Sequence, residues 1–302
     1  MKTLALGLGF LLLSAFAAAG PNVQSSQARL NAHQSGYLDV PGGKIYYEMA
    51  GAGDWIVLVH DGNLHSVTWD EQFPVYAKDY RVVRYDRRGY GKSSYPDKPY
   101  SNIEDLEEVF RQLNIDKATV MGMSAGGGLS IDFTLAHPEK VTRLVLVGAV
   151  VSGHGFSEHG RTRGGRLTEE TLSDPARLAD YMCHRDPYTC WEGNPEARRR
   201  GYAYLMSSLQ NYQRDKRRFT RGPARPALPI LGEIKAPTMI VVGEYDLPDC
   251  HAVAGILEVG IAGSTRIVLP KSAHIAPLEQ PAAFNELTLA FLKGKSSAPA
   301  GR

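Results

Sequence analysis

The chain has 302 residues, of which 43% are apolar and 22% are charged. This ordinary globular composition excludes a disordered, collagen-like or disulfide-scaffold protein, and the length suits one large domain or two smaller ones. With 34 Lys and Arg against 32 Asp and Glu, the net charge of +2 is too near neutral to draw the whole chain to nucleic acid or an anionic membrane.

The first residues read as a targeting segment rather than as part of the fold. Met1-Lys2 is followed by an apolar run from Leu4 to Ala19 that ends in small residues. This pattern predicts a secretory signal peptide over residues 1–19, and the alternative is an uncleaved membrane anchor. The run is shorter than the ~20 residues that a spanning helix needs. We therefore expect a secreted or periplasmic protein with no membrane association after signal cleavage.

Strands alternate with helices along most of the chain. Apolar runs predict strands at 37–40, 44–49, 55–59, 80–85, 118–122, 141–147, 238–242 and 265–269. Helices are expected at 103–113 with Asn102 as its cap, at 125–136 and at 284–292. This alternation is typical of an α/β fold with a parallel sheet covered on both faces, and the first two strands can add an antiparallel edge.

The alternation stops over residues 152–233, which are rich in Arg and helix-prone and show no strong strand. Because this stretch lies between two strands of the sheet, it is expected to be a helical cap over the sheet's end. It has 14 Lys and Arg against 10 Asp and Glu, a local net charge of +4 that would favour an anionic substrate. The rest of the folded chain is expected to form the core in two segments, residues 34–151 and 234–293. Residues 294–302 are expected to be a disordered tail.

A G-x-S-x-G motif, from Gly122 to Gly126, stands between a predicted strand and a predicted helix. A serine in such a sharp, strained turn tolerates only small neighbours two residues away, and the turn exposes its hydroxyl above the sheet. The Ala125 N–H opens the helix and points toward developing negative charge. We predict that Ser124 is a nucleophile. The alternative is a Gly-rich turn that only packs helix on strand.

Two further polar residues follow later strands. Asp246 comes just after the strand at 238–242, and His274 comes after the strand at 265–269. The order Ser, Asp, His is the one found in hydrolases with this serine turn. We therefore predict Asp246 as the catalytic acid and His274 as the base, with Glu244 as a rival acid.

With these motifs, the chain resembles the α/β-hydrolase superfamily, in the cap-bearing group of esterases, lactonases and related enzymes. Further support comes from His60-Asp61-Gly62 and from the run Asp86 to Ser93, which is similar to the family's D-x-R-G-x-G-x-S loop. The resemblance implies a mostly parallel eight-stranded sheet flanked by helices, with a helical cap insertion. It also makes Asp86 structural rather than catalytic.

The family's usual His-Gly is interrupted here by Asp61, which leaves open whether Gly62 or Asn63 provides the second oxyanion N–H; Gly62 is preferred. The resemblance implies that Ser124 attacks an acyl carbonyl, that His274 takes its proton and that Asp246 orients the imidazole. The N–H groups of Gly62 and Ala125 would hold the oxyanion. A serine where some relatives carry Asp disfavours epoxide opening and halide removal.

The leading hypothesis is an exported serine hydrolase that cleaves carboxylic esters of small or medium acyl substrates. A lactonase or a carbon–carbon bond hydrolase with the same triad is the alternative, and a non-catalytic ligand-binding protein is an alternative of another class. We expect no cofactor, a small-molecule ester-type substrate as partner and no nucleic acid; the oligomeric state is left open.

The three cysteines bear on disulfide formation and metal binding rather than on the predicted triad. Cys183 and Cys190 lie seven residues apart and could form a disulfide in an exported chain, although spacing alone leaves this open. Cys250 is then expected to pack as a small apolar residue. Three cysteines without a C-x-x-C motif make a zinc site unexpected, so we predict no metal ligands.

Overall fold

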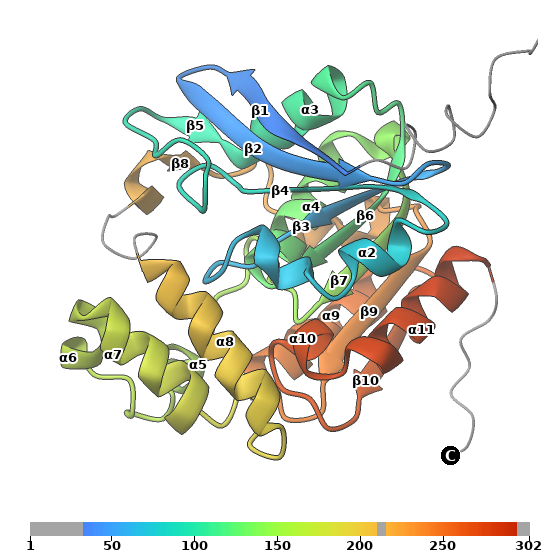
Figure 1. Ribbon diagram of the computed structural model, residues 1–302. Helices are drawn as coiled ribbons and strands as arrows, with labels where there is room; N and C mark the ends of the chain where they lie inside the picture. Colours follow the sequence, from blue (N-terminus) through green and yellow to red (C-terminus); the bar gives the residue numbers. More distant parts are fainter. Residues whose placement is uncertain (1–32, 210–215, 295–302) are drawn as a thin grey trace, which may run out of the picture.

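The computed structural model describes residues 33–209 and 216–294. The predicted signal peptide at 1–19 and residues 295–302 of the predicted tail lie outside the described residues. An eight-stranded sheet forms the centre of the molecule, in the order β1-β2-β4-β3-β6-β7-β9-β10 (Figure 1). The strands are β1 Gln34–Val40, β2 Gly43–Ala50, β3 Trp55–Val59, β4 Arg81–Tyr85, β6 Ala118–Met123, β7 Val141–Val147, β9 Thr238–Gly243 and β10 Thr265–Leu269.

The sheet is mostly parallel, as the sequence predicts. β1 pairs with β2 and β2 with β4 in antiparallel fashion, and every other pairing in this sheet is parallel. The central strands are buried on both faces, which explains their continuous apolar sequences. Parallel strands bring their carboxyl ends to one edge of the sheet, so the loops that follow β3, β6, β7, β9 and β10 meet there.

Helices cover both faces of this sheet. α3 Asn102–Gln112, α4 Ala125–Ala136 and α9 Pro248–Gly260 contribute to one hydrophobic core. The short helices α2 Phe73–Tyr76 and α10 Ala276–Glu279 join α11 Pro281–Leu292 in the core on the other face. One detail is corrected: Ser101, not Asn102, caps α3, because its hydroxyl accepts the Glu104 N–H. The helix α9 was not predicted from the sequence.

The insertion, residues 152–233 between the core strands, consists mainly of short helices. These are α5 Glu158–Thr162, α6 Glu169–Ser173, α7 Pro175–Asp180, a π-helical turn at Tyr181–Arg185 and α8 Pro195–Ser207. They gather beyond one end of the sheet, near α10 (Figure 1). Two strands were not expected: the two-residue β8 Thr220–Arg221 of the insertion pairs in parallel with the two-residue β5 Tyr100–Ser101, which precedes α3.

All three cysteines are buried free thiols. The sulfur atoms of Cys183 and Cys190 are 3.9 Å apart and in contact, so this structure has a thiol pair where the spacing left a disulfide open. Within residues 33–209 and 216–294, no helix is both long enough and apolar enough to cross a membrane.

Candidate active site

Ser124 occupies a strained turn between β6 and α4. Its backbone has φ 52° and ψ −118°, a conformation that side-chain-bearing residues rarely adopt. The flanking glycines are sterically required. A Cβ on Gly122 would collide with the Ser130 hydroxyl, and one on Gly126 would collide with the backbone oxygens of Val59 and His60. The predicted serine turn is therefore present.

Backbone hydrogen bonds hold this turn against the end of β7. The Ser124 N–H donates to the Val147 oxygen at 2.8 Å, and the Ser124 oxygen accepts the Val150 N–H at 3.2 Å and the Gly128 N–H at 3.0 Å. Ser124 is partly exposed as a residue. Hydrogen bonds that fix its backbone provide the held geometry that a nucleophile requires.

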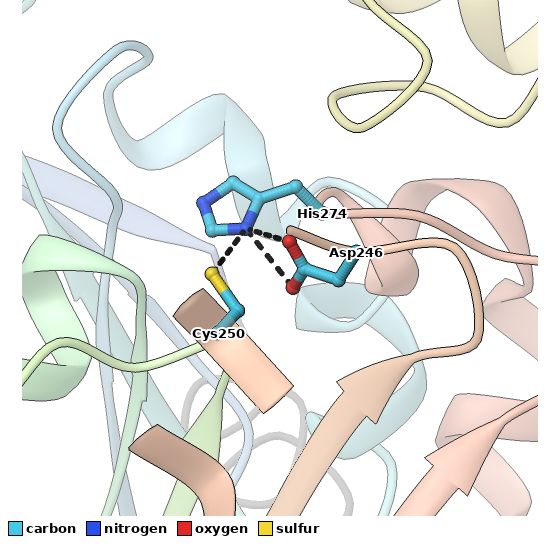
Figure 2. Close-up of side chains that lie close together, drawn as sticks. All are labelled: Asp246, Cys250 and His274. Atoms are coloured by element: carbon cyan, nitrogen blue, oxygen red, sulfur yellow. Dashed lines mark hydrogen bonds and ion pairs between the residues drawn. The ribbon is translucent and has the colours of Figure 1, made fainter. Parts of the chain in front are cut away.

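Asp246 and His274 form a hydrogen-bonded pair at the same edge. Nδ1 of His274 lies 2.9 Å from Oδ1 and 3.1 Å from Oδ2 of Asp246 (Figure 2). Burial disfavours a charged imidazole, but the adjacent Asp246 carboxylate outweighs burial and raises the pKa of His274 well above its ordinary value. The rival acid, Glu244, is exposed and accepts the Lys271 N–H instead.

Gly148 lets this pair approach the serine turn. It follows Val147, the residue that binds the Ser124 N–H, and it has φ +49°. A Cβ added there would lie 2.9 Å from Oδ2 of Asp246 and 3.1 Å from Nδ1 of His274. No hydrogen bond joins Ser124 to His274 among the described residues. Catalytic hydrogen bonds commonly tighten only when substrate binds.

Asp61, the departure from the family pattern, organises the loop after β3. Its Oδ1 accepts the N–H groups of Asn63 at 2.6 Å and Leu64 at 2.9 Å, and its Oδ2 accepts the Thr68 hydroxyl. Because the Asn63 N–H donates to Asp61, the geometry favours Gly62 as the second oxyanion donor. A Cβ on Gly62 would lie 3.4 Å from the Cβ of Ala125, so the two predicted donors are neighbours.

His60 and Asp86 both hold loops around the site, and for Asp86 this is the structural role that the family resemblance implies. Nε2 of His60 accepts the Arg87 N–H at 2.9 Å, and burial lowers the pKa of this imidazole well below its ordinary value. Asp86 accepts the N–H groups of Ser66 and Lys92. Both residues therefore hold loops in place around the site.

Glu279 is a buried acid that the sequence reading did not single out. Its carboxylate accepts the N–H of Ala273 at 2.8 Å and the N–H of Trp191 in the insertion. Burial raises the pKa of Glu279 to about 7, although both hydrogen bonds oppose the rise. Glu279 therefore links the insertion to the residue that precedes His274. Nothing in its sequence surroundings marks this contact.

The insertion also contacts the site directly. The N–H of His274 donates to the Tyr188 oxygen at 2.9 Å, and the N–H of Ile275 donates to the Thr189 oxygen. A small cavity lies between the insertion and the loop after β3, lined by Asp61, Asn63, Leu64, Met182, Cys183, Thr189, Cys190, Gly201, Leu205 and Ile275. Residues of the insertion are thus placed to shape what enters the site.

This sheet order, with a strained serine at β6 and an Asp–His pair after β9 and β10, defines an α/β-hydrolase. The chain belongs to the family described as "Alpha/beta hydrolase family", whose sequence model it matches over residues 56–287. It is an enzyme of this family, and relatives named as hydrolases support this against the alternative of a non-catalytic binding protein.

Two curated relatives match nearly the whole chain. The chain is 27% identical over 290 residues to 2-hydroxy-6-oxo-6-(2'-aminophenyl)hexa-2,4-dienoic acid hydrolase of Metapseudomonas resinovorans, covering 90% of this chain and 96% of the relative. It is 30% identical over 288 residues to 2-hydroxy-6-oxononadienedioate/2-hydroxy-6-oxononatrienedioate hydrolase of Klebsiella pneumoniae, covering 89% and 99%.

Solved structures agree on the fold. The structure described as Est816, an N-acyl homoserine lactone degrading enzyme, superposes with a TM-score of 0.71 at 26% identity, covering 85% of this chain and all of that one. The enol-lactonase from Burkholderia xenovorans LB400 gives 0.69 at 25% identity with the same coverage. These similarities fit the carbon–carbon hydrolase or lactonase alternative better than the leading ester-hydrolase hypothesis.

Proposed function

We propose that the protein is a serine hydrolase that cleaves a carbon–carbon bond next to a ketone in a 2-hydroxy-6-oxo-dienoic acid. A lactone is the second candidate substrate. The observation that carries this proposal is the Asp246–His274 hydrogen bond beside the strained Ser124, in a chain similar over its whole hydrolase domain to hydrolases of such acids. A simple carboxylic ester, our leading expectation from sequence, becomes the third candidate.

The chemistry follows from the placement of the side chains. Ser124 Oγ attacks the carbonyl carbon while Nε2 of His274 takes the hydroxyl proton, and Asp246 stabilises the imidazolium through Nδ1. The N–H groups of Gly62 and Ala125 hold the oxyanion. His274 then returns the proton to the departing group, and water hydrolyses the acyl-enzyme. For the dienoic acid, the dienol must first tautomerise to its 2-keto form, with the proton on the carbon beside the ketone, so that the electron pair of the broken carbon–carbon bond passes into a dienolate. The same attack opens a lactone directly, because its leaving atom is an oxygen.

The charge of the insertion supports an anionic substrate. Residues 152–233 have a net charge of +4, whereas the whole chain has +2. Dienoic acids are carboxylates at neutral pH, so a basic insertion over the site would attract them. Uncharged esters would gain nothing from this charge.

A substrate panel tests the proposal. We expect kcat/KM to be highest for a 2-hydroxy-6-oxo-dienoic acid, followed by N-acyl homoserine or enol lactones and then p-nitrophenyl esters. If simple esters are cleaved fastest, the result would contradict this proposal and support the ester-hydrolase hypothesis.

The nucleophile is tested by Ser124→Ala, which should lower kcat by ~10⁶, the scale of a lost catalytic serine. The matched control is Ser264→Ala, at an exposed hydroxyl that binds the Glu258 oxygen, and we expect wild-type rates from it. A fluorophosphonate probe should label the wild type and the control but not Ser124→Ala. Labelling of Ser124→Ala would contradict the assignment.

We also propose that residues 1–19 direct export, on the pattern of their side chains alone. Mass spectrometry of the protein from its native cells should show a mature chain that begins near residue 20, in the periplasm or the medium. An intact N-terminus in the cytoplasm would contradict this.

A further inference from the structure

Cys250 lies unexpectedly close to the Asp–His pair. It is placed on α9, four residues after Asp246, and its Sγ lies 3.8 Å from Nδ1 of His274 (Figure 2). Within the part of the chain that the structure describes, Asp246, Cys250 and His274 form a group whose ligand atoms all lie within 4.8 Å of one another. Figure 2 shows Nδ1 facing both the carboxylate and the thiol.

We propose that these three side chains form an inhibitory binding site for a borderline-soft divalent cation, zinc foremost. Carboxylate, thiolate and imidazole are the ligand types that Zn²⁺ prefers. Around a tetrahedral ion with Zn–S of about 2.3 Å and Zn–N or Zn–O of about 2.0–2.2 Å, ligand atoms lie roughly 3.3–3.6 Å apart. The observed separations of 2.9–3.1 Å and 3.8 Å are within a few tenths of an ångström of that range. A water molecule would complete the coordination.

A surface groove borders Asp246 on its solvent side. This residue lines a surface groove of about 610 Å³ together with Glu192 and Glu244, whose carboxylates favour cation entry. The other lining residues are Pro187, Tyr188, Trp191, Tyr245, Pro248 and His251. The ligands themselves are protected, since the side chains of Asp246 and His274 are 0% and 11% exposed.

The proton balance explains why binding would inhibit. The cation takes the lone pair of Nδ1, so the neutral imidazole must carry its proton on Nε2. The Cys250 thiol releases its proton to solvent and binds as thiolate, while Asp246 is already a carboxylate. His274 can then no longer accept the Ser124 proton at Nε2. Inhibition should be reversible, because no covalent bond to carbon forms or breaks.

Two readouts test the site on the full-length protein. In the first, Zn²⁺ is titrated into the hydrolysis assay; the wild type should lose activity and EDTA should restore it. In the second, Co²⁺ replaces Zn²⁺, and a thiolate-to-cobalt charge-transfer band should appear in the absorption spectrum. The inhibition readout depends on the proposed role of His274, whereas the cobalt band does not.

Cys250→Ala should raise the Zn²⁺ concentration for half-inhibition at least about tenfold, relative to its own metal-free rate, and should abolish the cobalt band. The matched control is Val253→Ala, which truncates another buried side chain of α9 and leaves the three ligands in place; it should respond to the metal like the wild type. Circular dichroism verifies that both variants fold.

The absence of a cobalt band in the wild type would overturn the proposal. A band or an inhibition that is lost in Val253→Ala but kept in Cys250→Ala would overturn it as well. A Cys250-dependent band without any inhibition would keep the metal site and instead contradict the catalytic role of His274. The two proposals therefore fail in distinguishable ways.

Discussion

The carboxylate of Glu279 accepts the backbone N–H of Ala273 at 2.8 Å, immediately before His274 in the chain. The same carboxylate accepts the N–H of Trp191 in the insertion, and Glu279 is only 3% exposed. Buried backbone N–H groups need a hydrogen-bond acceptor, because a buried donor without one has lost its hydrogen bond to water and gained none in the protein. Glu279 therefore holds the loop of His274 and the insertion in a common position.

Replacing Glu279 should produce a graded loss. Glu279→Ala leaves the N–H groups of Ala273 and Trp191 without an acceptor, and each unpaired group should lower the free energy of unfolding by ~1–3 kcal/mol. Glu279→Gln retains one acceptor oxygen and should lose about half as much. Urea unfolding measures both. We expect kcat to fall in the same order with KM little changed, because a displaced imidazole affects chemistry more than binding; equal kcat in all three proteins would contradict the positioning role.

Activity should depend on pH through His274. The general base must be neutral, and Asp246 raises the pKa of His274 despite its burial. The imidazole therefore remains charged, and the enzyme inactive, to a higher pH than an unperturbed histidine with a pKa near 6.5 would allow. We expect kcat/KM to rise with pH through a midpoint above 6.5. A midpoint at or below 6.5 would show that Asp246 does not control this titration.

Asp246→Asn should leave the fold intact but lower kcat by ~10⁴. An asparagine can hold the imidazole in the wrong tautomer and cannot stabilise its charged form. The matched control is Glu244→Gln, which changes the nearby exposed carboxylate that binds the Lys271 N–H. That control should keep nearly full activity. A large loss in Glu244→Gln with a small one in Asp246→Asn would make Glu244 the catalytic acid.

Gly148→Ala should damage the site through crowding. Its Cβ would lie 2.9 Å from the Asp246 carboxylate and 3.1 Å from Nδ1 of His274, at a backbone position with φ +49°. The left-handed conformation alone costs about 1–2 kcal/mol for a residue with a Cβ. We expect lower kcat and a lower melting temperature. Gly155→Ala is the control, because nothing lies within 4 Å of its added Cβ; similar losses in both variants would refute the argument.

The sequence alone predicted the eight-stranded sheet of the α/β-hydrolase fold. The strands 55–59, 141–147 and 265–269 and the helix 125–136 match the structure at both ends. Two of these elements have strong local signals: a continuous apolar run for the buried strand 55–59 and a Gly-flanked serine before the helix. Parallel strands bring their carboxyl ends to one edge of the sheet, so residues that follow these strands are expected to lie close together. Asp246 and His274 do form a hydrogen bond at that edge.

Other features depended on contacts between segments distant in sequence. Glu279 accepts the N–H of Trp191, 88 residues away in the chain. Gly148, just after β7, adjoins Asp246 and His274, and the Asp61 carboxylate holds the loop after β3 through contacts that its motif did not predict. Cys250, expected only to pack, faces Nδ1 of His274 because α9 turns its first residues toward the end of β9. Local sequence determines elements and the order of reactive groups, because periodicity and turn chemistry act over a few residues. Only the packed chain decides which buried polar atoms become partners, because those distances depend on every intervening segment.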